Sequence, residues 1–216
     1  MNRFGSALRV VGGLALVASG LVACTDDTPS GPTPGVATVA FTPRPVALPY
    51  IALSRAQVQL DRVLIIGNMP PPPPPDQPPP DRPPPDRPPL PNVSLDALSS
   101  AGASASFEDF PQGLYSRVRF TLGRISLEGT ARGTVFNVSI APFGVIVDVR
   151  ASVPQELRLD TNINFPVSVD PNIWFPPYLF EGAMLDNRGE IVADEVSNPQ
   201  IGMALVQGMT RSFSLP

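Results

Sequence analysis

The chain has 216 residues, 43% of them apolar, which is enough for one domain of ordinary size with a real core. Its net charge is −4 and all fifteen basic residues are arginines, so the excess of basic surface that nucleic-acid binding requires is missing. With no histidine and a single cysteine, the sequence excludes an intramolecular disulfide, the common zinc and iron sites, and Ser-His or Cys-His nucleophile pairs.

Residues 1–23 have the three-part pattern of an export signal peptide. A basic start with Arg3 and Arg9 precedes an apolar run that is too short for a permanent membrane helix. The sequence Leu-Val-Ala-Cys that ends at Cys24 resembles a bacterial lipobox. The resemblance implies that Cys24 carries acyl chains, palmitate among them, and becomes the first residue of a membrane-anchored lipoprotein.

The residue after the lipidated cysteine is Thr25 rather than aspartate, which resembles the sorting pattern of outer-membrane lipoproteins. Loss of two arginines with the leader takes the net charge from −4 to −6. Residues 24–45 are rich in Pro, Gly, Thr and Asp, and we expect a flexible tether there, with 36–42 as one short strand. The folded domain is predicted to cover residues 46–216.

Residues 54–66 begin with clean alternation of apolar and polar side chains and end in the apolar run Val63–Ile66. This pattern predicts a strand that is half exposed at its start and buried on both faces at its end.

Residues 70–91 interrupt the domain with a repeat of the form P-P-P-D-R. Prolines in this density favour polyproline II, and 22 residues would extend roughly 68 Å at about 3.1 Å each. We expect a disordered insert that serves as a semi-rigid spacer. A docking motif for a proline-binding partner and a boundary between two domains are the alternatives.

After the insert, residues 93–98 predict a strand and the small residues 99–106 a loop. Pro111 and Gly113 predict a turn, and the strand that follows alternates. We expect its core face to carry Leu114, Val118, Phe120 and Leu122, and its outer face Tyr115, Arg117, Arg119 and Thr121.

Further strands are predicted over 125–128, 135–140 and 144–149, with a hairpin at 129–133. The longest alternation, over 156–170, predicts one half-buried strand or two strands bent at Pro166. Short strands separated by turn signals, without a convincing helix, indicate an all-β fold, an antiparallel sandwich or barrel, and we expect an antiparallel β-sandwich.

The pattern P-x-G-x-Y-x-x-V-R from Pro111 to Arg119 resembles the core of an uncharacterised family of bacterial lipoproteins, a domain of unknown function. The likeness extends over residues 46–170, with the proline tract as an insertion. The same turn and strand also occur in transthyretin-like and carboxypeptidase-regulatory-like sandwiches, which implies an Ig-like or prealbumin-like fold. The resemblance implies no catalytic or ligand-binding residues.

Four aromatic residues, Trp174, Phe175, Tyr178 and Phe180, lie close together near the C-terminus. If exposed, they form a binding surface for sugar rings or for a partner's anchor residue. If buried, they form a lid over the core, which is the simpler interpretation.

Asp160, Asn162 and Asn164 suggest a calcium site, but alternate strand residues lie about 6.6 Å apart and calcium ligands converge within about 2.5 Å. A solvated face explains them better. The acidic stretch 186–190 lacks the spacing of a calcium loop and predicts a hairpin turn. We expect no cofactor.

Arg117 and Arg119, with Arg124, form either a basic stripe or cross-strand pairs with acidic residues, and pairing is the simpler interpretation.

These patterns favour a non-enzymatic binding or structural module of the cell envelope, held at the membrane by its acyl chains. An envelope protein or a glycan is the expected partner. The alternative is a hydrolase of envelope polysaccharide, which needs two carboxyl groups about 5 to 9.5 Å apart across a cleft. A third hypothesis is an assembly accessory whose proline tract docks a partner.

Overall fold

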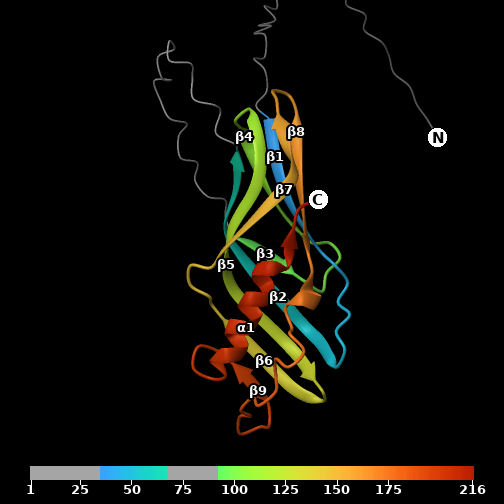
Figure 1. Cartoon of the computed structure of the whole chain (residues 1–216), viewed down its shortest axis with the longest axis vertical. Coiled ribbons are helices and arrows are strands. Elements are labelled where there is room, and N and C mark those ends of the chain that lie inside the picture. Colours follow the sequence, from blue (N-terminus) through green and yellow to red (C-terminus); the bar gives the residue numbers. More distant parts are fainter. Residues whose placement is uncertain (1–34, 68–91) are drawn as a thin grey trace, which may run out of the picture. The chain divides into compact units, whose positions relative to one another are not determined.

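The computed structural model describes residues 35–67 and 92–216 (Figure 1). These residues belong to one compact unit. Within them the chain forms ten strands, one α-helix and one 3-10 turn. The predictions made for the signal peptide, for Cys24 and for the proline tract concern parts of the chain outside the described residues.

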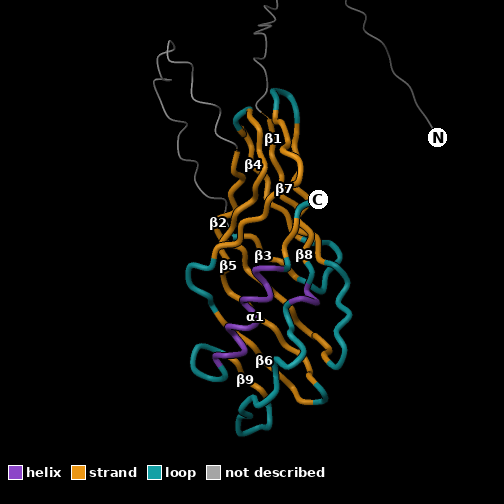
Figure 2. Tube along the Cα trace, viewed as in Figure 1, coloured by secondary structure: helices purple, strands orange, loops and turns teal. Residues whose placement is uncertain are grey.

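The strands form two sheets, so the prediction of an all-β sandwich is confirmed (Figure 2). One sheet has the order β10-β8-β1-β4 and the other β3-β2-β5-β6-β9, with β7 paired to β5. The bounds are β1 Gly35–Pro43, β2 Ile51–Gly67, β3 Val93–Asp96, β4 Ala103–Phe110, β5 Gly113–Ala131, β6 Thr134–Ile140, β7 Ile146–Leu157, β8 Asn162–Val169, η1 Pro171–Ile173, β9 Ile191–Ala193, α1 Pro199–Arg211 and β10 Phe213–Ser214.

The strand pairing is not antiparallel throughout. β1 pairs with β8 in parallel, and β6 pairs with β9 in parallel. Each parallel pair joins segments that are far apart in the sequence, and hairpin signals, which are local, carry no information about such pairs. Both sheets are therefore mixed rather than wholly antiparallel.

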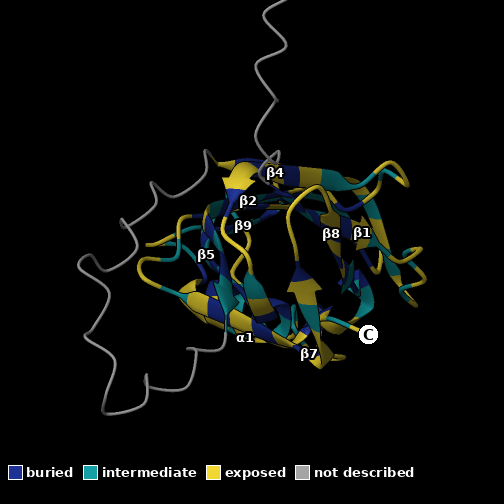
Figure 3. Cartoon of the chain, turned by 90° about the horizontal axis from the view of Figure 1, so that it is seen from above, coloured by how far each residue is buried: buried dark blue, intermediate teal, exposed yellow. Residues whose placement is uncertain are grey.

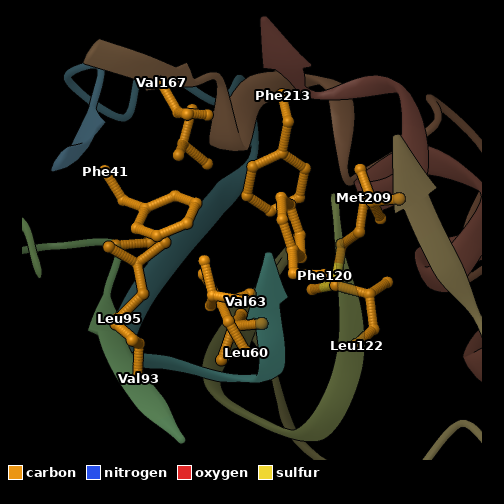
Figure 4. Close-up of a cluster of buried hydrophobic side chains, with 14 of the residues drawn as sticks. Phe41, Leu60, Val63, Val93, Leu95, Phe120, Leu122, Val167, Met209 and Phe213 are labelled. Atoms are coloured by element: carbon orange, nitrogen blue, oxygen red, sulfur yellow. The ribbon is translucent and has the colours of Figure 1, made fainter. Parts of the chain in front are cut away.

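The core lies between the facing sides of the two sheets. Buried and exposed residues alternate along the strands, as Figure 3 shows. The Phe120 ring of β5 packs edge to face against Phe41 of β1 at 5.5 Å and against Phe213 of β10 at 4.8 Å. Figure 4 shows side chains from both sheets pointing into this shared core: Phe41, Val167 and Phe213 from the four-stranded sheet, and Leu60, Val63 and Phe120 from the other.

β1 belongs to this core. It lies between β4 and β8, and its residues Ala37, Val39 and Phe41 are at most 1% exposed. The domain therefore begins at Gly35 or earlier, and the predicted tether 24–45 extends too far toward the C-terminus.

α1 corrects the expectation that the domain has no helix. Its residues Ile201, Leu205 and Met209 follow the four-residue spacing of one helix face and are buried. Gly202 and Gly208 lower the helix propensity of this segment, and for this reason the sequence did not predict a helix here despite the apolar spacing. At Gly208 the helix comes close to η1, because a Cβ there would lie 2.6 Å from the carbonyl oxygen of Ile173.

The alternating stretch 156–170 is two strands, and the break lies before Pro166 rather than at it. β7 ends at Leu157, β8 begins at Asn162, and the turn between them is held by Thr161 Oγ1, which accepts from the Arg158 N–H at 2.9 Å. The turn inserts an even number of residues, so Leu157 and Ile163 both face the core. The alternation of apolar and polar residues therefore continues across the turn, and the sequence pattern does not reveal where the turn lies.

β5 is one strand of 19 residues where the sequence predicts two. Its pairing with β7 is irregular between Tyr115 and Arg117, and this bulge reverses the alternation at the start of the strand. Leu114, predicted in the core, is 49% exposed, whereas Tyr115, predicted outside, is 8% exposed and donates its hydroxyl to the Pro111 carbonyl at 2.7 Å. The predicted loop 99–106 is also too long, because β4 begins at Ala103.

Two local predictions are closer to the structure. Ala131 pairs with Thr134, and Arg132 and Gly133 have positive φ, so the predicted hairpin is confirmed. In β2, Val63 and Ile65 are buried but Leu64 and Ile66 only partly, so burial on both faces is incomplete there.

Candidate functional site

A cavity of about 670 Å³ opens at the end of the domain where β2 begins and β5 ends. Three segments form its walls: residues 47–51, the β5–β6 turn, and residues 172–181. The lining residues are Ala47, Leu48, Pro49, Tyr50, Ile51, Ala131, Arg132, Thr134, Asn172, Phe175, Pro176, Pro177, Tyr178, Leu179, Phe180, Glu181 and Ile191.

The structure brings three of the four predicted aromatic residues to this cavity: Phe175, Tyr178 and Phe180. Phe175 is buried at 6% exposure, and the Phe180 ring stacks on Phe136 of β6 at 4.7 Å. Tyr178 is 71% exposed. The simpler interpretation, a lid over the core, thus holds for Phe175 but not for Tyr178.

Trp174 does not line the cavity. Its side chain is fully buried, and its Nε1–H donates to Ser212 Oγ at 2.9 Å. It is therefore part of the core under the cavity rather than part of a binding surface.

Sequence reasoning missed the part of the cavity wall that Tyr50 and Arg132 form. Tyr50 is 76% exposed, and the Arg132 guanidinium lies 5.9 Å from the centre of its ring. Arg132 also pairs with Glu181 at 3.4 Å. Tyr50 and Arg132 lie 82 positions apart in the sequence, and only the antiparallel register of β2 and β5 brings them together.

Asn172 ties the cavity wall to η1. Its Oδ1 accepts from the Ala47 N–H at 2.7 Å, and its Nδ2 donates to the Pro45 carbonyl at 3.1 Å and to Asp170 Oδ1 at 2.9 Å. The loop before β2 is thereby fixed against the segment that carries the aromatic residues. The two walls are therefore held together before any ligand enters.

Two of the three arginines of β5 pair across the sheet, as the simpler interpretation predicts. Arg119 lies 2.5 Å and Arg117 3.9 Å from Asp148 Oδ2 of β7. Arg124 forms no ion pair within residues 35–67 and 92–216.

The acidic stretch at 186–190 is a turn, as predicted, since Leu185 bridges to Ile191 and Gly189 has φ of 78°. The N–H groups of Glu190 and Arg188 donate to Asp186 Oδ1 at 2.9 and 2.8 Å, and these bonds hold the pKa of that carboxyl below its usual range.

Asp160 lies in the turn before β8, and Asn162 and Asn164 are exposed on that strand, as expected of a solvated face. In the part of the chain that the structure describes, no three acidic or thiol side chains gather in a way that would hold a metal ion.

A second hollow of about 510 Å³ lies over β2, β5 and β6. It brings Glu128 and Glu190 to one surface, together with Ser54 of β2 and Asn137 of β6. Glu128 also pairs with Arg55 at 3.2 Å. Sequence reasoning missed that Glu128 and Glu190 lie on one surface. Glu190 directly precedes β9, and only the parallel pairing of β9 with β6 brings it to this part of the sheet.

Comparison with models of protein families finds no match, and comparisons with characterised proteins and with solved structures find none either. Among the described residues, no helix is both long and apolar enough to cross a lipid bilayer.

Proposed function

We propose that this protein is a lipoprotein of the cell envelope, anchored at the outer membrane through Cys24, whose β-sandwich is a non-enzymatic binding module. The lipobox resemblance at Cys24 supports the anchor. The cavity between residues 47–51 and 172–181 supports the binding role.

The observation that carries the binding role is the pair of exposed tyrosines that line the cavity. Tyr50 and Tyr178 leave 76% and 71% of their surface in solvent while they line a largely apolar hollow. A large aromatic ring with a polar tip is suited to bind a ligand at a boundary between apolar surface and water. Deletion of both rings should therefore remove ligand contacts without disturbing the core.

Binding is tested on the soluble form, residues 25–216, with a panel of envelope glycan fragments and neutral lipids, by amide chemical-shift changes. We expect a ligand to shift the amides of the non-proline residues within 47–51 and 175–181, and the double variant Tyr50→Ala with Tyr178→Ala to weaken ligand binding. A panel in which no compound shifts these amides counts against the binding role.

The anchor is tested by metabolic labelling of a bacterial host with palmitate. The full chain should incorporate label and sediment with membranes, and Cys24→Ser should lose both. Thr25→Ser is the matched control, since it keeps the cysteine and should keep the label. Equal labelling of Cys24→Ser and the full chain would refute lipidation at this residue.

Hydrolysis of envelope polysaccharide stays the second candidate, because Glu128 and Glu190 line one hollow. If this candidate is right, the soluble form releases reducing ends from the polysaccharide, and Glu128→Gln and Glu190→Gln each lose that activity. Glu195→Gln changes an exposed carboxylate outside the hollow and serves as the control. The binding module predicts no release by any of these forms.

A further inference from the structure

The lining of the cavity beside β2 and β5 is largely apolar, which limits the chemical class of ligand that the cavity can bind. Only four of the seventeen lining residues have polar or charged side chains apart from the two tyrosines: Arg132, Thr134, Asn172 and Glu181. A volume of about 670 Å³ falls in the range of pockets that enclose a small molecule.

Three of the four polar side chains of the lining already have partners within the protein. Asn172 uses its amide oxygen and nitrogen on the backbone of residues 45 and 47 and on Asp170. Arg132 and Glu181 form an ion pair, so the two charges of the lining cancel. A charged ligand therefore finds no excess of opposite charge there.

The backbone of the walls also has few groups to offer. Pro49, Pro176 and Pro177 have no N–H. The N–H groups of Arg132, Leu179 and Glu181 already donate to carbonyls of the same walls, at 2.8, 3.0 and 3.0 Å. A peptide laid against these walls would lose its hydrogen bonds to water without regaining them.

The same reasoning disfavours a sugar. Each ring hydroxyl that enters the cavity without a partner carries a desolvation cost, whereas hydrocarbon gains free energy by leaving water. Resting on the proposed binding role of this cavity, we infer that its ligand is an uncharged hydrocarbon group, an acyl or isoprenoid chain. The solvent-exposed Tyr50 and Tyr178 would meet the polar end of such a lipid.

The test uses residues 25–216 and N-phenyl-1-naphthylamine, an uncharged apolar probe that accepts energy from tryptophan. Trp174 is the sole tryptophan, is fully buried and directly precedes Phe175 of the cavity lining, so a bound probe lies near the donor. We expect saturable sensitised emission with one probe per chain. Farnesol, a neutral isoprenoid, should displace the probe.

Two variants connect the signal to the cavity. The double variant Tyr50→Ala with Tyr178→Ala should weaken probe binding about tenfold, and Ala47→Phe, which places a ring at an exposed lining position, should weaken it as strongly. The matched control is Phe143→Ala with Val196→Ala, which removes two apolar side chains that are 103% and 85% exposed and lie outside the lining. Binding that is unsaturable, or equally strong in all variants, overturns the inference.

The outcomes separate the ligand class from the binding role. If a glycan fragment binds with sensitivity to Tyr50→Ala and Tyr178→Ala while the probe does not, the cavity is a binding site and the hydrocarbon ligand is wrong. If neither ligand binds, both proposals fail. Far-UV circular dichroism and Trp174 emission confirm that each variant is folded.

Discussion

A single hydroxyl satisfies the indole of the only tryptophan. Ser212 Oγ accepts from Trp174 Nε1–H at 2.9 Å and donates to the Met209 carbonyl at 2.8 Å, both inside the core. Ser212→Ala leaves a buried N–H without a partner, so we expect a loss of about 1–3 kcal/mol in the free energy of unfolding. Urea unfolding followed by Trp174 emission measures it. Ser214→Ala, an exposed hydroxyl two residues on, should cost less than about 0.5 kcal/mol.

A second residue makes stability depend on pH. Asp194 Oδ1 accepts from the N–H groups of Ser197 at 2.6 Å and Val196 at 2.8 Å, and these bonds lower the pKa of its carboxyl. A pKa that is lower in the folded state contributes stability that is present above the unfolded pKa and is lost as the pH falls below about 4.

Asp194→Asn keeps the acceptor oxygen but removes the titrating group. We therefore expect its urea midpoint to fall less than that of the wild type between pH 7 and pH 3. Glu195→Gln, a neighbouring exposed carboxylate, controls for the general loss of charge. Identical pH dependence in Asp194→Asn and wild type would contradict the role of this turn.

At the same scale, composition identified the aromatic segment but not the exposure of its members. Trp174 and Tyr178 are four positions apart and equally compatible with core or surface, yet one is fully buried and the other is 71% exposed. Trp174 lies where α1 approaches η1, and α1 was not predicted. Tyr50, the other exposed ring of the cavity, carried no sequence signal that distinguished it from an ordinary loop residue.

Among the elements, α1 offers a test in which helix propensity and packing oppose each other. Gly208→Ala improves helix propensity by about 1 kcal/mol. The added Cβ, however, would lie 2.6 Å from the Ile173 carbonyl oxygen and 2.9 Å from Trp174 Cα, and backbone atoms cannot rotate away. We expect a net loss of about 1–3 kcal/mol in urea unfolding, as for other overpacked sites.

Gly202→Ala on the same helix is the comparison. Its Cβ would meet only side-chain atoms of Ile140, the nearest at 3.3 Å, so it should cost less than Gly208→Ala. Equal effects of the two substitutions would mean that propensity, rather than the approach of α1 to η1, decides the outcome.

Strands and tight turns were predictable because their signals are local. The hairpin turn contains Gly133, a residue type that tolerates positive φ, and the apolar period of β8 appears directly in the sequence. The bulge near Tyr115 was not predictable, since it depends on how β5 meets β7. The parallel partners of β1 and β6 were also beyond sequence reasoning, because nothing local to either strand specifies them.

For the whole molecule, the position of β1 predicts where truncation becomes destructive. A chain that begins at Val46 lacks Ala37, Val39 and Phe41, which are buried between the sheets. We expect this form to show no cooperative urea transition, whereas a chain that begins at Gly35 should unfold cooperatively. A cooperative transition in the shorter form would show that β1 is dispensable.

The connection between β2 and β3 tests the spacer hypothesis for residues 70–91. Val93 pairs with Leu60, seven residues before the end of β2 at Gly67, so the connection spans about 23 Å. Outright deletion of 70–91 would leave four Cα–Cα steps between Gly67 and Val93, and these reach about 14 Å at most. Replacement by a Gly-Ser linker of equal length is therefore the appropriate change.

If the tract is a spacer, this replacement should leave the urea midpoint and the envelope localisation unchanged. If it is a docking motif, the protein stays folded but loses its partner in cross-linking of intact cells. A replacement that abolishes folding would contradict both hypotheses.

The parallel pairing of β1 and β8 also dictates when the protein can fold. Val36 pairs with Asn162, so β1, the first strand among the described residues, has to await a partner made 126 residues later, an interval of about 6–25 s at bacterial elongation rates. Contacts of such long range give high contact order and slow folding. Until β8 arrives, the backbone groups on the β8 side of β1 are open to pairing with other chains, and a holding chaperone that protects this edge would raise the yield of native protein.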